Sequence, residues 1–162
     1  MNWYWEEVRK VFRNDSHMMD HTQRVYDFVQ HIAADQTGMD PEERRIIAIT
    51  ALLHDIGILE AEKKYGSRSG KYQHIEGPPL VRSIMTRAGE TPAIIERVAF
   101  IVGNHHHFSQ ADGTDFQILI EADMLVNLQN ETIRPDILAG FIDRFFKTTR
   151  GRELARHIYL EE

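Results

Sequence analysis

The sequence predicts an all-α protein that forms one domain, a helical bundle of about six to eight helices. Apolar residues recur with helical spacing through most of the chain, and no extended alternating run indicates a β-strand. Prolines stand where several of these periodic segments begin, a position that a helix start tolerates. The length of 162 residues is that of one ordinary domain, so we expect residues 1–162 to form a single unit.

The expected helices follow one another from the N-terminus. In order they span residues 2–12, 16–38, 41–57, 74–87, 92–103, 115–129, 135–146 and 151–160. Asn2, Ser16, Asp40 and Thr91 are the expected caps, because such side chains accept hydrogen bonds from free backbone N–H groups. Residues 58–72 lose the apolar spacing and gather Gly, Ser, Lys and Arg, so they are expected to form a loop.

The composition indicates a soluble globular protein of the cytoplasm. Hydrophobic residues make up 42% of the chain and charged residues 27%. No apolar run approaches the roughly 20 residues of a membrane span, and the first residues, MNWYWEEVRK, lack the features of a secretory signal. A net charge of −6 argues against binding of duplex nucleic acid. Small-molecule ligands are therefore favoured, no membrane partner is expected, and a homo-oligomer is left open.

A histidine and an aspartate stand side by side where the third expected helix ends. The stretch TALLHDIG places His54 and Asp55 after a run that is apolar almost all round the helix, so both are expected inside the fold. Asp123 lies in a similar setting within the stretch ILIEADMLV. A carboxylate removed from water is normally paired, hydrogen-bonded or bound to a metal. These side chains therefore need partners.

Histidines are the partners that the chain offers. His21, His74 and the triplet at residues 105–107 lie near the starts or ends of expected helices, and with the buried carboxylates they have the composition of a metal site. Successive helix residues diverge by about 100°, so only one or two of the triplet are expected to converge. His17, one turn before His21, is an alternative to it. The alternative interpretation of the triplet is a solvated cluster at the surface. For Glu121, two residues before Asp123, the alternative is an acid on the surface of its helix.

Several motifs in a fixed order resemble the HD-domain superfamily, a group of all-helical metal-dependent hydrolases acting mainly on phosphate esters and anhydrides. They are DHTQRV, ALLHDIG, HIEGPPLVRSIM, IVGNHHH and EADMLVNL, and they fall within residues 16–130. ALLHDIG resembles the family's His-Asp signature, and DHTQRV resembles its first-histidine helix. The resemblance implies an HD-type bundle with residues 16–130 as its motif core.

The resemblance also implies a set of metal ligands. One ion would be held by His21, His54, Asp55 and Asp123, and a second by His74, His105 and His106. Asp55 would bridge the two ions, and His54 and Asp55 are the expected catalytic residues, because a water shared by two ions is activated beside them. One or two divalent transition-metal ions are expected. Iron or manganese is favoured, with zinc, nickel or cobalt as alternatives, and the absence of cysteine excludes thiolate ligands.

The activity implied is hydrolysis of a phosphoester or phosphoanhydride bond in a small phosphorylated substrate, with a nucleotide favoured. The cyclic-dinucleotide phosphodiesterases of the HD-GYP branch are not matched. They carry lysine, glutamate and a Gly-Tyr-Pro turn where this chain has Ile58, His107 and DGTDF. The basic side chains expected to contact phosphate are Arg24, Lys63, Lys64 and Arg68. Glu121 or Asp20 is expected to fix a histidine tautomer.

Two rival functions remain open at this point. The same helical cage would support an iron-dependent oxygenase, as a resemblance to the inositol-oxygenase branch implies, and oxygen consumption would separate that activity from hydrolysis. A metal-binding sensor module without turnover would be expected to have lost a ligand. No ligand of the expected set is missing here, so the sensor ranks third.

Overall fold

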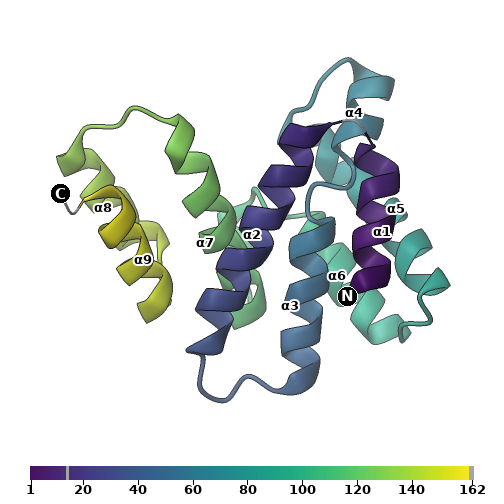
Figure 1. Cartoon of the computed structure of the whole chain (residues 1–162), viewed down its shortest axis with the longest axis horizontal. Helices are drawn as coiled ribbons and strands as arrows, with labels where there is room; N and C mark the ends of the chain where they lie inside the picture. The colour runs from purple at the N-terminus through teal and green to yellow at the C-terminus, as the bar shows by residue number, and fades with distance from the viewer. Residues whose placement is uncertain (14, 161–162) are drawn as a thin grey trace.

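Helices provide all the regular structure in the described part of this computed structural model, residues 1–13 and 15–160. The α-helices are α1 (Asn2–Phe12), α2 (Ser16–Ala34), α3 (Pro41–Leu53), α4 (Ile58–Tyr65), α5 (Gly70–Arg87), α6 (Pro92–Val102), α7 (Thr114–Asn127), α8 (Pro135–Phe145) and α9 (Thr149–Tyr159). Two short 3-10 turns, Phe108–Gln110 and Leu128–Asn130, flank α7. The all-α fold class is thereby confirmed (Figure 1).

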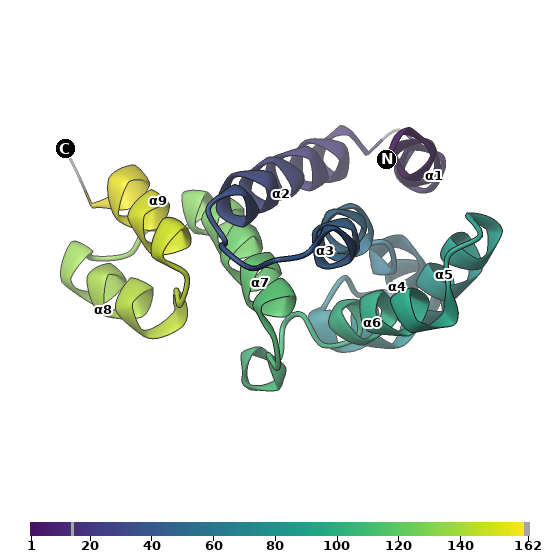
Figure 2. The same cartoon turned by 90° about the horizontal axis from the view of Figure 1, so that it is seen from below.

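Helices α3 and α7 are the most completely enclosed elements. Residues 46–53 of α3 are all buried, and so are residues 115–126 of α7 except Gln117. Helix α2 packs against both, and α1 and α6 pack against α3 (Figures 1 and 2). A helix that is apolar on most sides is expected to be enclosed in this way. The polar side chains in these buried stretches of α3 and α7 therefore lie in the interior of the fold.

Of the four expected caps, Asp40 and Thr91 occupy N-cap positions, whereas Asn2 and Ser16 are the first residues of their helices. Asp40 accepts a hydrogen bond from the backbone N–H of Glu43, and the Glu43 side chain accepts one from the N–H of Asp40, which completes a capping box before Pro41. At α2 the cap is Asp15, which accepts from the N–H of Met18, and Ser16 is the first helical residue. The prediction of Ser16 as the cap was wrong by one position.

The segment after α3 folds differently from the prediction. Helix α3 ends at Leu53, so His54 and Asp55 lie in a turn over residues 54–57 instead of in the helix. The expected loop then contains α4, which buries Ile58 and Ala61 and ends at Gly66 in the left-handed conformation (φ 65°). Helix α5 begins at Gly70, four residues before the predicted start. The loop-like composition of residues 58–72 concealed this short amphipathic helix, which lies between two glycines.

Gly57 allows the turn after α3 to approach the backbone of α5 closely. A Cβ atom added at Gly57 would lie 2.5 Å from the backbone nitrogen of Gly77, a distance that real Cβ atoms do not adopt. Backbone contacts of this kind require glycine because no side chain fits between them. The contact holds the turn with the His-Asp pair against the helix that carries His74.

Glu121 is fully buried and holds the C-terminal helix pair against α7. Its carboxylate accepts hydrogen bonds from the backbone N–H groups of Lys147 (2.6 Å) and Thr148 (2.9 Å), and from the Thr148 hydroxyl. The predictions of Glu121 as a surface acid or as a partner of a histidine were therefore wrong. The Asp20 side chain is 71% exposed and lies 4.0 Å from Arg24, so it does not fix a histidine either.

No helix in the described ranges combines the length and apolar character needed to cross a membrane.

Candidate metal centre

Side chains from five segments meet where α3 ends. His21 comes from α2, His74 from α5, and Asp123 from α7, while His54 and Asp55 occupy the turn after α3. His105 and His106 follow the end of α6. Because α3 is enclosed on all sides, His54 and Asp55 are buried, with 1% and 8% of their surface exposed. The sequence prediction that the pair is carried inside the fold agrees with this position.

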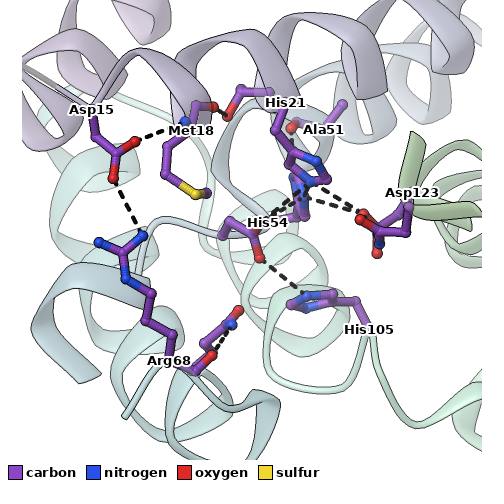
Figure 3. Close-up of polar contacts among 12 residues, drawn as sticks. Asp15, Met18, His21, Ala51, His54, Arg68, His105 and Asp123 are labelled. Carbon is purple, nitrogen blue, oxygen red and sulfur yellow. Dashed lines mark hydrogen bonds and ion pairs between the residues drawn. The ribbon is translucent and has the colours of Figure 1, made fainter. Parts of the chain in front are cut away.

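The first group of donor atoms surrounds one oxygen of Asp55. Oδ2 of Asp55 lies 3.2 Å from Nε2 of His54 and 3.4 Å from Nε2 of His21. Oδ1 of Asp123 lies 3.2 Å from the same nitrogen of His21 (Figure 3). Donor atoms of His21, His54 and Asp55 all lie within 4.8 Å of one another. Imidazole nitrogens and carboxylate oxygens at this spacing can share one transition-metal ion.

The second group contains three histidines. Donor atoms of His74, His105 and His106 also lie within 4.8 Å of one another. Oδ1 of Asp55, the oxygen that does not face His21, lies 3.6 Å from Nε2 of His105. The two oxygens of one carboxylate therefore face the two groups. His107 is exposed and belongs to neither group, although its ring centroid lies 4.5 Å from that of His74.

Backbone contacts set which nitrogen each buried histidine can present. Nδ1 of His54 lies 2.9 Å from the carbonyl oxygen of Ala51, and Nδ1 of His105 lies 2.8 Å from that of Val102. A carbonyl accepts only, so each Nδ1 carries the proton and the neutral ring offers its Nε2 lone pair. Backbone carbonyls thus fix these histidine tautomers, a role that the sequence had predicted for Glu121 or Asp20.

Two buried histidine nitrogens lack a hydrogen-bond partner among the described residues. They are Nε2 of His105 and Nδ1 of His74. A buried polar atom without a partner is rare in a folded protein and calls for an explanation. A metal ion is such an explanation for Nε2 of His105, since a neutral imidazole binds through a nitrogen lone pair. Nε2 of His74 accepts from the backbone N–H of His106 at 3.4 Å, which leaves the proton on its Nδ1. The residues present therefore fit the metal that their composition implies.

The charges of the two groups differ. Burial lowers the pKa of His54, but the adjacent Asp55 and nearby Asp123 outweigh burial and raise this pKa to about 9 in the protein without metal, so a metal that binds Nε2 of His54 would displace a proton. Burial and the neighbouring His105 lower the pKa of His74 to about 4, and the same causes lower that of His106 to about 4. Burial opposes ionisation of Asp55, but His54 and His105 keep the pKa of that carboxyl well below its usual range.

Sequence reasoning missed one side chain at the centre. Asn127 donates a hydrogen bond through its Nδ2 to Oδ1 of Asp123, at 2.9 Å, and so fixes the oxygen that faces His21. The spacing of four residues on one helix was the available signal, because such residues share a face. Gly70 was also missed: a Cβ there would lie 2.4 Å from Nδ1 of His106, so only glycine leaves room for this ring.

Of the four basic side chains predicted to contact phosphate, three have partners outside the metal centre and one is exposed. Lys64 pairs with Glu60 and Glu76, and Arg68 pairs with Asp15 and Glu62. Arg24 donates to Gln129 and lies near Asp20. Lys63 is exposed. In Figure 3 the side chain of Arg68 turns towards Asp15 and away from the histidines.

Comparison with known proteins identifies a matching family. The model of the family described as HD domain matches residues 18–145, a range that contains both donor groups. A search of curated proteins found no match to this chain. A search of solved structures also found none.

Proposed function

Because this chain belongs to the HD-domain family, we propose that it is a metal-dependent hydrolase of phosphoester or phosphoanhydride bonds. The family consists mostly of phosphohydrolases. The observation that carries the proposal is the arrangement of Asp55, whose Oδ2 faces His21 and His54 while its Oδ1 faces His105. A carboxylate placed between two sets of imidazoles is suited to bridging two ions, which a mononuclear site does not require.

The substrate class follows from the chemistry of such a centre. Two divalent ions bound there would lower the pKa of a shared water and offset the charge that develops on the attacking and leaving oxygens. Iron or manganese is favoured as the metal, and zinc, nickel and cobalt suit the same donors. A small phosphorylated metabolite, with a nucleotide first among the candidates, is the proposed substrate.

The side chains of the chain itself have distinct tasks in this proposal. Asp55 orients the attacking water between the two groups. His54 and His105 present fixed Nε2 lone pairs, because backbone carbonyls hold their Nδ1 protons. Asn127 keeps Asp123 turned towards His21. A hydrogen-bonded outer partner of this kind typically changes metal affinity or activity by about 10- to 100-fold.

The test combines metal content with hydrolysis. Protein purified without added metal is analysed for iron, manganese and zinc, and then assayed with bis(p-nitrophenyl) phosphate and a panel of nucleoside phosphates. We expect bound metal and turnover in the unchanged protein, and loss of both in Asp55→Asn and His54→Ala with helical circular dichroism retained. The control is His31→Ala, an exposed histidine that contacts the backbone of Asp27 and lies outside both groups.

Either of two results would contradict the proposal. One is wild-type metal content and turnover in Asp55→Asn. The other is stoichiometric oxygen consumption by iron-loaded protein together with no hydrolysis of any phosphate ester, which would assign the centre to an oxygenase.

A further inference from the structure

A pocket of about 340 Å³ lies between the 3-10 turn after α6, helix α7 and the end of α8. The rings of Phe108 and Phe145 line it with centroids 5.6 Å apart, and the buried Ile120 adds further apolar surface. Small-molecule sites have volumes from about 300 Å³ upward and are mostly apolar with a few polar groups. The pocket therefore has the size and lining for the flat apolar part of a small ligand.

The pocket adjoins the candidate metal centre through two elements. Phe108 comes two residues after His106, a member of the second donor group. Ile120 lies three residues before Asp123 on α7, and residues three apart share a helix face. Figure 2 shows the segment between α6 and α7 lying beside the start of α7, on the side towards α8. The centre and the pocket therefore share the segment after α6 and one face of α7.

Two cations at the pocket have no carboxylate partner among the described residues. The guanidinium of Arg144 lies over the ring of Phe145, 5.1 Å from its centroid, and Arg144 is exposed. The Lys147 side chain has no partner in the described part of the chain, although its backbone N–H donates to Glu121. In a chain with a net charge of −6, unneutralised cations beside an apolar pocket favour an anionic ligand.

Gln117 adds one polar group of known direction. Its amide nitrogen donates to Glu121 at 2.8 Å and to the carbonyl oxygen of Phe145 at 2.9 Å. Both partners are acceptors, so the two amide hydrogens are used and the orientation of the amide is fixed. The carbonyl oxygen of the Gln117 amide remains. It can accept a hydrogen bond, for example from the amino group of a nucleobase.

We propose that this pocket is the base-binding subsite of the centre and that the substrate is a nucleotide. Its base lies against Phe108, and Arg144 and Lys147 provide a positive potential around it. This inference rests on the proposed function, because it takes the phosphate to be held at the metal centre.

The test compares two ligands that differ only in the base. The probes are the phosphonate analogues of adenosine 5′-monophosphate and of ribose 5-phosphate, whose carbon–phosphorus bonds resist hydrolysis. Calorimetric titration of metal-loaded protein gives the affinity of each. We expect the adenosine analogue to bind about tenfold more tightly or better, since stacking of one base on an aromatic ring is worth at least that much.

Substitutions at the pocket then test whether it causes the preference for the adenosine analogue. Phe108→Leu and Arg144→Gln should each reduce the affinity ratio about threefold or more. The matched controls are Phe100→Leu, because Phe100 is 37% exposed against 38% for Phe108, and Arg9→Gln, because Arg9 also lies over an aromatic ring. Both controls should leave the ratio unchanged.

The outcomes separate this inference from the proposed function. Equal, measurable affinities for the two analogues would overturn the pocket assignment and leave the hydrolase proposal intact. A preference for the adenosine analogue that survives both Phe108→Leu and Arg144→Gln would also overturn it. Binding of neither analogue to fully metal-loaded protein would contradict both proposals.

Discussion

Nε2 of His105 lies 3.6 Å from Oδ1 of Asp55, which is too long for a hydrogen bond, and this nitrogen has no hydrogen-bond partner among the described residues. The two atoms face each other with the separation expected of ligands that share an ion and not of a bonded pair.

Removal of the second donor group should leave one ion. We expect His74→Ala and His105→Ala each to lower metal content to about one ion per chain, because His21, His54, Asp55 and Asp123 remain, and to reduce turnover strongly. Metal analysis of the purified variants checks this. A crystal soaked in manganese that shows one anomalous peak, with His74 turned away from it, would contradict the two-ion arrangement.

Loss of the amide beside Asp123 should weaken metal binding without removing a ligand. Asn127→Ala deletes the hydrogen bond to Oδ1 of Asp123, and we expect metal affinity to fall about tenfold or more. Competition with a chromogenic chelator measures this. Gln23→Ala is the matched control, because Gln23 makes the same amide-to-carboxylate bond to Asp27 on the exposed face of α2. Equal effects of the two substitutions would show that the bond at Asp123 has no special role.

The buried carboxylate of Glu121 should matter for stability and not for metal. In Glu121→Gln, the side chain loses its charge and one of its two accepting oxygens, so the hydrogen bonds from Lys147 and Thr148 weaken and we expect the free energy of unfolding to fall by about 2–4 kcal/mol. Amide exchange should accelerate in α8 and α9, while metal content stays unchanged. Chemical denaturation and hydrogen exchange check both points, with the exposed Glu153→Gln as control. Loss of metal from a Glu121→Gln protein that is still folded would contradict this prediction and would assign Glu121 to the metal centre.

Acid should remove the stabilisation that Glu90 provides. Burial opposes ionisation of this side chain, but hydrogen bonds from Arg45 and Tyr4 lower the pKa of Glu90 below its usual value. A carboxyl group whose pKa is lower in the folded than in the unfolded protein stabilises the fold at pH values above the unfolded-state pKa. This stabilisation is lost as the pH falls through the folded-state pKa. Glu90→Gln should therefore cost about 1 kcal/mol at pH 7 and progressively less below the ordinary glutamate range. Denaturation at several pH values tests this, with Glu131→Gln as the exposed control; a pH-independent difference would contradict it.

The enclosed helices could be predicted from sequence because burial leaves a direct mark on composition. The all-round apolar character of residues 46–53 correctly indicated that His54 and Asp55 are carried inside. Prolines at 41, 92 and 135 correctly marked helix starts, because proline lacks the N–H that a first turn cannot bond. These signals are local, and each depends on a few neighbouring residues.

The errors concern features that depend on distant partners. Glu121 looked like a surface acid because nothing near it in sequence indicates the N–H groups of Lys147 and Thr148. Arg68 looked available to phosphate because Asp15, which pairs with it, lies 53 residues earlier in the chain. Helix α4 was missed because its composition resembles a loop, and its burial of Ala61 arises from packing against α5. The assignment of each ligand to one ion or the other stays a prediction.

The close approach of Gly57 to the backbone at Gly77 makes position 57 the fixed point for any redesign of this centre. Under the proposed assignment of the pocket, substitutions of the exposed Phe108 and Arg144 alter substrate preference. A methyl group at position 57, in contrast, would drive the turn that carries Asp55 away from the helix that carries His74. A change of one methyl group would then separate the two donor groups, so a library built on this scaffold should leave Gly57 untouched.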